Sequence, residues 1–302
     1  MTGNIWFFGT GHFAAKCLQA ISKDVPISLV VTQPPTRAGR GLKLRPSAVE
    51  ETAKACKLKL SCSEAVNKDE SLISTLKAEN PDVILVIDFG QWVGEPWLST
   101  PKFGCINIHP SLLPKYRGAA PLQRALMDGC TTTGVTLFRL APKMDAGAIW
   151  LSAQSEIGEN EQFPQLRDRL AELGSKMFCD NLAAMLTGGA TFKEQDEALA
   201  TYAKKIQKSE CLLNPELPAQ KLHGIVRGLA PSPGAYFMYN GKRIKVLESR
   251  TAAEKGEAGK PFISKGKVLF AAADASLELI TVQPEGKKAM RAQDWARGAL
   301  RK

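Results

Sequence analysis

This chain lacks several features that are typical of secreted proteins, membrane-spanning proteins and proteins stabilised by a bound metal. Its seven cysteines are scattered, odd in number and form no Cys-x-x-Cys pair, so neither a disulfide framework nor a zinc site is expected. The first residues, MTGNIWFFGTG, lack the basic start and long apolar run of a signal peptide. No apolar stretch approaches the roughly 18 residues that a membrane span needs. We therefore expect a cytoplasmic protein without a bound metal.

Acidic charge is scarce in the C-terminal part of the chain. Residues 206–302 hold 17 basic and 9 acidic side chains, which gives +8 of the total net charge of +10. Residues 1–205 are nearly neutral by comparison. A basic C-terminal part predicts a polyanionic partner, although surplus lysine also simply keeps a protein in solution.

The pattern of apolar residues up to residue 189 predicts an α/β domain. Short apolar runs alternate with helical patterns, which is typical of a Rossmann-like, doubly wound and mainly parallel sheet with helices on both faces. We expect strands at 5–8, 27–32, 83–87, 105–108, 135–140 and 148–151, and helices at 13–21, 47–56, 69–79, 121–127 and 161–186. In such sheets, ligands bind beyond the carboxyl ends of the strands.

The composition and the hydrophobic pattern of the sequence change after Gly188-Gly189. A polar stretch leads into short β-rich runs at 235–239, 243–247, 267–271 and 277–282, with Asn240-Gly241 as a hairpin signal. Short strands separated by turns predict a small, OB-like β-barrel. We place a first domain at 1–189, a linker at 190–206 and a C-terminal barrel at 207–302.

The glycines after the first strand raise the question of a dinucleotide site. Residues 9–14 read Gly-Thr-Gly-His-Phe-Ala and fit the pattern GxGxxA. A true fingerprint needs an acidic residue at the end of the second strand to hold the ribose. That strand ends in Thr32-Gln33 instead, so we interpret the glycines as a tight turn between strand and helix.

Polar residues of catalytic type occur at the end of the fourth expected strand. Asn107 and His109 alternate with Ile106 and Ile108, so both polar side chains lie on one face of the strand. A sheet interior accepts such a pair only if it is hydrogen bonded or used in chemistry, which favours a site over a structural pair. Asp145 follows a later strand and is an acid that could orient and charge a histidine, although an Asp in a loop is usually a turn residue.

Asn107, His109 and Asp145, with SLLPKYRG at 111–118, resemble the signature of the 10-formyltetrahydrofolate-dependent formyltransferases. The resemblance implies direct formyl transfer, with Asn107 and His109 as hydrogen-bond donors to the formyl oxygen and Asp145 supporting a protonated His109. It assigns folate contacts to two segments: Val86, Ile87, Asp88, Phe89 and Gly90, and Ser111, Leu112, Leu113 and Pro114. The family usually has VVAYG where this chain has Val86 to Gly90, so Asp88 is unexpected there.

Two further stretches resemble the branch of this family that acts on methionyl-tRNA. They are the basic loop VTQPPTRAGRGLKLRPSAV at 31–49 and VQPEGKKAMRAQDW at 282–295. The resemblance implies 10-formyltetrahydrofolate as formyl donor and methionyl-initiator tRNA as partner. We also expect the chain to work as a monomer. The implied tRNA contacts are Arg37, Arg40, Lys43 and Arg45 in the loop, and Lys242, Arg243, Lys245, Lys287 and Lys288 in the barrel.

Two other functions remain open at the level of sequence. A formyltransferase acting on a sugar-nucleotide or a glycinamide ribonucleotide amine shares the Asn, His and Asp residues, but needs neither the 31–49 loop nor a basic barrel. A non-catalytic RNA-binding protein that kept only the fold of the enzyme would not need the Asn, His and Asp residues. The presence of all three residues speaks against this alternative.

Overall fold

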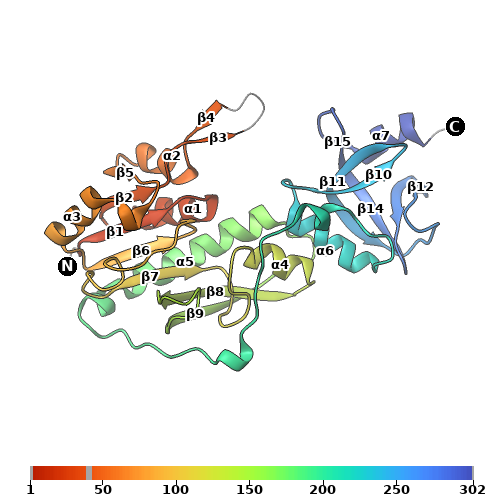
Figure 1. The fold of residues 1–302 in the computed structure, drawn as a ribbon. Helices are drawn as coiled ribbons and strands as arrows, with labels where there is room; N and C mark the ends of the chain where they lie inside the picture. The colour runs from red at the N-terminus through yellow and green to blue at the C-terminus, as the bar shows by residue number, and fades with distance from the viewer. Residues whose placement is uncertain (1–2, 39–42, 301–302) are drawn as a thin grey trace. The chain divides into compact units, whose positions relative to one another are not determined.

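The computed structural model describes residues 3–38 and 43–300 (Figure 1). The chain forms two compact units that interleave in sequence. The first unit consists of Met1–Arg117, Gly134–Ser155 and Arg167–Thr201, and the second of Gly118–Thr133, Glu156–Leu166 and Tyr202–Lys302. The domain limits expected at 189 and 206 stay a prediction.

A seven-stranded sheet forms the centre of the first unit. Its strand order is β5-β2-β1-β6-β7-β8-β9. The bounds are β1 Ile5–Gly9, β2 Ile27–Thr32, β5 Leu60–Cys62, β6 Val83–Ile87, β7 Cys105–His109, β8 Thr132–Arg139 and β9 Ile149–Glu156. The strands from β5 to β7 pair in parallel, and β8 is antiparallel to β7. The expected Rossmann-like, mainly parallel sheet is confirmed.

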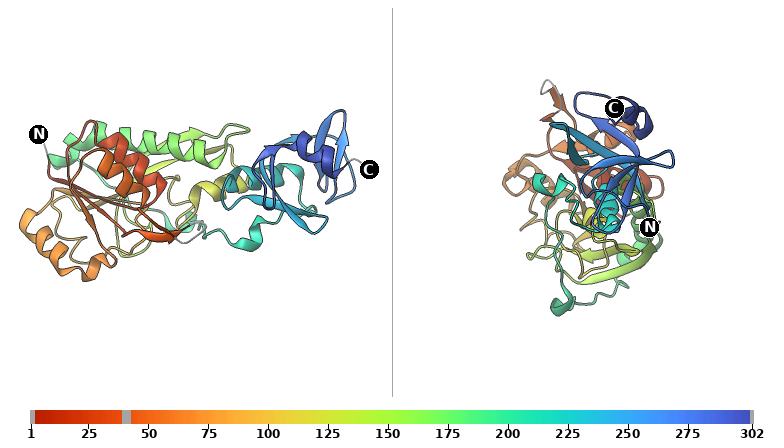
Figure 2. Two further views of the ribbon diagram at one scale, coloured as in Figure 1. Left: turned by 90° about the horizontal axis from the view of Figure 1, so that it is seen from above. Right: turned by 90° about the vertical axis from the view of Figure 1, so that its right-hand side faces the viewer.

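Helices cover both faces of this sheet (Figures 1 and 2). They are α1 His12–Ile21, α2 Ala48–Ala55, α3 Glu70–Glu79 and α5 Phe163–Leu186. Trp6 and Phe8 of β1 share an apolar cluster with Leu72 of α3 on one face. Gly174 of α5 lies against Ile108 on the other face. Side chains at alternate positions of β7 therefore point to opposite layers.

Two helix starts form where the sequence provides an oxygen-bearing cap. The Ser47 hydroxyl accepts from the Glu50 N–H at 2.9 Å and begins α2. The Asp69 carboxylate accepts from the Leu72 N–H at 3.0 Å and begins α3. Each cap satisfies an N–H that would otherwise lack a partner at the start of a helix.

The strand order reverses between β1 and β6, so the loops after these two strands meet. The N–H groups of Thr10 and Gly11 donate to the Asp88 carbonyl at 3.0 and 3.1 Å. A Cβ at Gly11 would lie 1.8 Å from Asp88 Oδ2. The second glycine of the GxGxxA pattern is thus required by the close approach of Asp88. Such a switch point is where open α/β sheets bind ligands.

The second unit is built on an antiparallel sheet of order β10-β11-β14-β13-β12, with β15 paired to β14. The bounds are β10 Ala235–Tyr239, β11 Lys242–Ala252, β12 Pro261–Ser264, β13 Lys267–Ala271, β14 Ser276–Pro284 and β15 Met290–Arg291. Asn240 and Gly241 join β10 to β11 with positive φ angles of 48° and 72°, as the hairpin signal predicts.

Some elements were not expected from the sequence. They are the short strands β5, β12 and β15, the hairpin of β3 Thr36–Ala38 with β4 Lys43–Arg45, the helices α6 Ala219–Leu229 and α7 Ala292–Ala299, and the 3₁₀ turns η1 Val66–Lys68, η2 Glu197–Leu199 and η3 Lys208–Cys211. The expected helix at 121–127 is α4 Pro121–Met127, which packs beside α6 in the second unit. Within the described ranges, no helix combines the length and the apolar character that a bilayer span requires.

Candidate active site

Asn107 and His109 lie at the carboxyl end of β7 and project from the same face. The Asn107 Nδ2 donates to the Val86 carbonyl of the neighbouring strand at 2.7 Å, which leaves its second N–H for another acceptor. The Asn107 Oδ1 is buried and has no hydrogen-bond partner among the described residues. A buried, unpaired amide oxygen is costly in a core, so this residue has the character of a ligand contact rather than of packing.

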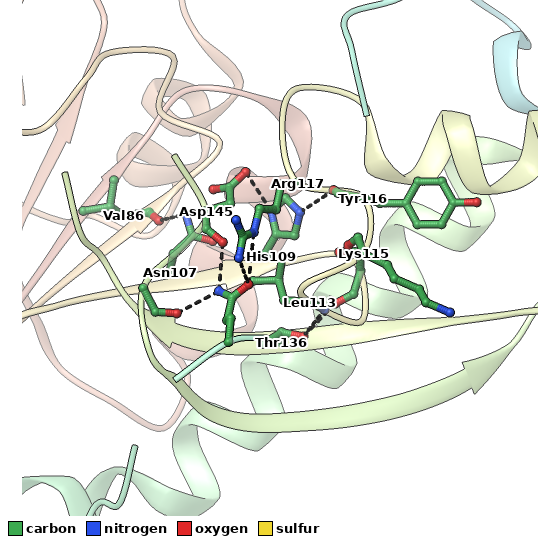
Figure 3. A network of polar contacts seen from close by, with 12 residues as sticks. Val86, Asn107, His109, Leu113, Lys115, Tyr116, Arg117, Thr136 and Asp145 are labelled. Atoms are coloured by element: carbon green, nitrogen blue, oxygen red, sulfur yellow. Dashed lines mark hydrogen bonds and ion pairs between the residues drawn. The ribbon is translucent and has the colours of Figure 1, made fainter. Parts of the chain in front are cut away.

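Each ring nitrogen of His109 faces an oxygen atom of a neighbouring loop (Figure 3). Its Nε2 lies 3.0 Å from the Tyr116 carbonyl, and because a carbonyl only accepts, this nitrogen carries a hydrogen. Its Nδ1 lies 3.9 Å from Asp145 Oδ2, and the two side chains are only 7% and 14% exposed. That distance is an ion-pair contact and exceeds a hydrogen bond. Nδ1 is therefore the nitrogen that faces the carboxylate and can exchange a proton.

Three residues around the site adopt a left-handed backbone that side chains other than Gly seldom take. The φ angles are 44° at Asp88, 59° at Tyr116 and 50° at Asp145. Each such residue costs on the order of 1 kcal/mol or more and persists only where surrounding contacts fix it. Residues of this kind cluster at functional sites, and here each belongs to a loop that meets the edge of the sheet.

The segment after His109 is fixed by hydrogen bonds to β8. The Thr136 hydroxyl donates to the Ser111 carbonyl at 2.7 Å and accepts from the Leu113 N–H at 3.1 Å. The Ser111 hydroxyl is buried and donates to the Lys115 carbonyl at 2.7 Å. These bonds set the path of residues 110–118. Folate contacts by this segment, and by Val86 to Gly90, stay a prediction.

Asp88 bonds to the first turn of α1. Although the residue as a whole is exposed, its carboxylate lies against this turn, and the resulting loss of hydration raises the pKa of Asp88 to about 6. The hydrogen bond from the Phe13 N–H and the nearby charge of Arg167 lower the pKa by less. The unexpected acid of the Val86 to Gly90 segment thus lies beside Gly11, at the switch point of the sheet.

Sequence reasoning missed two residues of the site, Arg117 and Gln195. The Arg117 guanidinium is fully buried, and its Nε and Nη2 donate to Gln195 Oε1 at 3.1 and 2.8 Å. The Gln195 Nε2 donates to the carbonyls of Asp145 and Gly147 at 2.9 and 2.7 Å. Arg117 stands in the quoted SLLPKYRG motif and could have been considered. Gln195 lies in the polar stretch that we expected to be a linker, where no pattern marks it.

Of the residues predicted to bind tRNA, those that the structure describes are exposed, except Lys245, which is half-buried. Arg37 belongs to β3, and Lys43 and Arg45 belong to β4, all on the hairpin after β2. Arg40 lies outside the described residues. In the second unit, Lys242, Arg243 and Lys245 lie on β11, and Lys287 and Lys288 follow β14, the strand with which β11 pairs. The Arg243 guanidinium lies 4.6 Å above the Tyr236 ring.

The other two histidines of the chain have different environments. His223 is buried in the second unit, where its ring lies 3.0 Å from Ser249 Oγ and 3.2 Å from the Glu159 carbonyl, and burial lowers its pKa. His12 is exposed at the start of α1. In the part of the chain that the structure describes, no group of three His, Cys, Asp or Glu side chains is placed to hold a metal ion.

The chain belongs to the formyl transferase family. The family's formyl transferase domain matches residues 3–182 and its C-terminal domain matches residues 205–300. Among curated relatives, a methionyl-tRNA formyltransferase of Moorella thermoacetica is 38% identical over 296 residues, which cover 97% of this chain and 95% of the relative. One from Jannaschia sp. is also 38% identical, over 98% of this chain and 96% of the relative.

Solved structures share the fold at lower identity. WlaRD, a sugar 3N-formyl transferase crystallised with dTDP and 5-N-formyl-THF, has a TM-score of 0.66 at 17% identity and covers 95% of this chain and all of that one. HypX from Aquifex aeolicus, in complex with tetrahydrofolic acid, has a TM-score of 0.68 at 15% identity, over 100% of this chain and 48% of that one. At this level of identity, the similarities show that the fold is shared and nothing more.

Proposed function

We propose that this chain transfers the formyl group of 10-formyltetrahydrofolate to the free amino group of methionyl-initiator tRNA, which gives the N-formylmethionyl-tRNA that starts translation. The observation that supports this proposal most strongly is the group of Asn107, His109 and Asp145 at the carboxyl edge of the sheet. Nδ1 of His109 lies 3.9 Å from the Asp145 carboxylate. The relatives that match over nearly the whole chain bear the name of this activity.

The half-buried side-chain amide of Asn107 fits the role of a hydrogen-bond donor to the formyl oxygen. Attack on the formyl carbon by a neutral amine builds negative charge on that oxygen, and a fixed donor stabilises it. The bond to the Val86 carbonyl at 2.7 Å holds the amide in place before substrate binds, so no reorganisation is needed during the reaction. Loss of one such donor typically costs ~10²–10³ in rate.

His109 fits the roles of charged donor and proton carrier. Its Nε2 is engaged by the Tyr116 carbonyl, so proton exchange with the reacting atoms falls to Nδ1. The Asp145 carboxylate beside Nδ1 attracts positive charge on the ring. The formyl folate supplies an activated formyl carbon, whose bond to the folate nitrogen breaks as the bond to the α-amine forms. His109 gives the leaving nitrogen a proton, and the proton that the attacking amine loses restores the ring. A placed acid adds ~10²–10⁴ to such a step.

The basic residues fit a tRNA substrate. The β3–β4 hairpin presents Arg37, Lys43 and Arg45 at exposed positions of the first unit. In the second unit, Lys242 and Lys245 lie on β11, and Lys287 and Lys288 lie in the segment after its partner strand β14. Clustered lysine and arginine bind the phosphate backbone through counterion release. A charged initiator tRNA as substrate also supports a cytoplasmic location, and we propose that the chain acts as a monomer.

A side-by-side transfer assay tests this function against the alternative within the family. Purified chain and 10-formyltetrahydrofolate are offered methionyl-initiator tRNA, an amino-sugar nucleotide or glycinamide ribonucleotide, and the formylated products are measured. We expect formylation of the tRNA with a specificity constant far above that of the other two acceptors. Preferential formylation of either small amine would overturn the proposal, and tRNA binding without formylation of any acceptor would favour the RNA-binding alternative.

A further inference from the structure

Gln195 is bonded to both loops that hold the reacting side chains. On one side, its Oε1 accepts from Nε and Nη2 of Arg117 at 3.1 and 2.8 Å. On the other, its Nε2 donates to the Asp145 and Gly147 carbonyls at 2.9 and 2.7 Å. All four bonds lie within the first unit. One amide therefore connects the segment after β7 with the loop after β8.

The residues that Gln195 bonds either follow a residue that contacts His109 or lie in the loop of Asp145. Arg117 follows Tyr116, whose carbonyl accepts from His109 Nε2 at 3.0 Å. The Asp145 carbonyl belongs to the residue whose carboxylate faces His109 Nδ1 at 3.9 Å. The ring thus has one nitrogen fixed by the first loop and the other facing the second loop. The relative position of these loops determines where the imidazole and the carboxylate meet.

The backbone around Gln195 is attached to the same loop. The Tyr116 N–H donates to the Thr201 hydroxyl at 2.8 Å and the Arg117 N–H donates to the Thr201 carbonyl at 2.9 Å. Glu197 forms an ion pair with Arg117 Nη2 at 2.9 Å and bonds to Lys143. Hydrogen bonds from Arg117 and Lys143 lower the pKa of Glu197 to about 2, so it remains a carboxylate and keeps Arg117 in place.

We propose that Gln195, acting with buried Arg117, is a positioning residue for formyl transfer that sets the approach of Asp145 to His109. The left-handed backbone of Tyr116 and Asp145, with φ of 59° and 50°, needs surrounding contacts of this kind to persist. An amide suits the position because it accepts from a guanidinium and donates to two carbonyls at once. The proposal rests on the function proposed above, and its test includes a measurement without substrate.

The variant Gln195→Glu separates positioning from folding. A glutamate keeps the acceptor for Arg117 and adds an ion pair, but it cannot donate to the Asp145 and Gly147 carbonyls when ionised. We expect kcat to fall by ~10²-fold, as for a misplacement of about 1 Å, with KM for both substrates and the thermal midpoint nearly unchanged. Gln195→Met removes both sets of bonds and should lower kcat and the thermal midpoint together. Glu194→Gln, at an exposed neighbouring residue, is the matched control.

The second measurement is nuclear magnetic resonance of the histidine rings in the substrate-free protein, which has only three histidines. The Nε2–H signal of His109, protected by the Tyr116 carbonyl in the parent chain, should shift or exchange faster in Gln195→Glu and stay unchanged in Glu194→Gln. Parent-like kcat in Gln195→Glu, an unchanged His109 signal, or activity that falls only in proportion to folded protein would overturn the proposal. If the parent chain does not formylate tRNA but the His109 signal still responds, the proposed function fails and the positioning role stands.

Discussion

The side chains of Asn107 and His109 reach the same edge of the sheet because they alternate with two isoleucines. Ile108 packs against Gly174 of α5, so its neighbours on β7 must face the other layer. The same alternation that buries the isoleucines therefore presents an amide and an imidazole side by side. The hydrophobic pattern of five residues fixes the direction of the two groups on which the proposed chemistry depends.

Removal of either side chain tests that assignment. We expect Asn107→Ala and His109→Ala each to lower the rate of formyl transfer by ~10²-fold or more, since each loses a donor to the developing oxyanion, while tRNA affinity stays nearly intact. Steady-state kinetics and tRNA binding should be measured together. His12→Ala serves as control because His12 is exposed at the start of α1. Near-parental turnover in either variant would remove that residue from the site.

Asp88 offers a pH-dependent test of stability. Its folded pKa of about 6 lies above the ordinary 3.8, so the folded state binds the proton more tightly and stability falls as pH rises from about 4 to 6. Asp88→Asn should relieve this cost above pH 6, by about 1 kcal/mol once solvent screening of the exposed residue is counted. Urea unfolding at pH 4 and pH 8 should show the gain at pH 8 only. A gain of equal size at both pH values would contradict the account.

At the scale of elements, the strands were predictable where burial is continuous. The run Val83–Ile87 was expected with the bounds that the structure shows and is buried at every position, because strands covered on both faces are apolar throughout. The run Ile27–Thr32 was also expected with its observed bounds, although Ser28 is exposed. Helix α6 was missed because Gly224 and Gly228 interrupt its pattern. A Cβ at Gly224 would lie 2.5 Å from the Leu126 carbonyl of α4, so tertiary contact, which the sequence does not display, selects the glycine.

The residues of the candidate site also differ in whether the sequence could predict them. Asn107 and His109 are two residues apart and could be predicted from local alternation. Arg117 and Gln195 are 78 residues apart, and their pairing depends on how the 195–201 segment runs along the loop after β7. A polar residue in a polar stretch carries no mark of burial, so only the structure reveals it.

Gly174 tests how tightly α5 packs on the strand that carries the site. A Cβ there would meet the Ile108 and Val135 methyl groups at 2.4 and 2.9 Å, and these β-branched side chains have little rotamer freedom. Gly174→Ala should therefore destabilise the chain by about 1–3 kcal/mol. Gly298→Ala in α7, where a Cβ meets nothing within 4 Å, should instead stabilise it by up to about 1 kcal/mol. The midpoints of denaturant unfolding measure both changes in stability. Equal shifts of the midpoint in the two variants would refute the packing argument.

The β3–β4 hairpin tests the proposed contact with tRNA phosphates. Arg45 is exposed on β4 opposite Thr36. Arg45→Ala should weaken binding of initiator and elongator tRNA by a similar factor and flatten the salt dependence by about one counterion. Thr36→Ala, its uncharged cross-strand neighbour, should leave the salt dependence unchanged. Affinities at two salt concentrations are needed, and an unchanged slope for Arg45→Ala would exclude a phosphate contact.

For Arg40, the prediction rests on the sequence alone. It stands between Gly39 and Gly41, so no neighbouring side chain competes for space near a nucleic acid. We expect Arg40→Ala to relax discrimination between initiator and elongator methionyl-tRNA by ~1–3 kcal/mol, as for loss of a base-edge contact. Parental selectivity in this variant would mean that the loop does not read the tRNA and that the second unit carries recognition.

At the scale of the whole molecule, the catalytic residues lie in the first unit, whereas the basic residues predicted to bind tRNA lie in both units. The first unit holds Asn107, His109 and Asp145, and the second carries most of the excess positive charge. A small amine acceptor would need only the first unit, whereas a tRNA is large enough to use both. This division is the feature of the whole chain that agrees best with the proposed acceptor.

Following a labelled formyl carbon tests the central claim most directly. The chain is mixed with 10-[¹³C]formyltetrahydrofolate and methionyl-initiator tRNA, and the label is traced by mass spectrometry in tRNA, protein and free formate, with His109→Ala in parallel. Direct transfer predicts that the label appears on the α-nitrogen of methionine, mole for mole with the folate consumed, and not on the protein. Label released as formate, or retained covalently on the chain, would contradict the account.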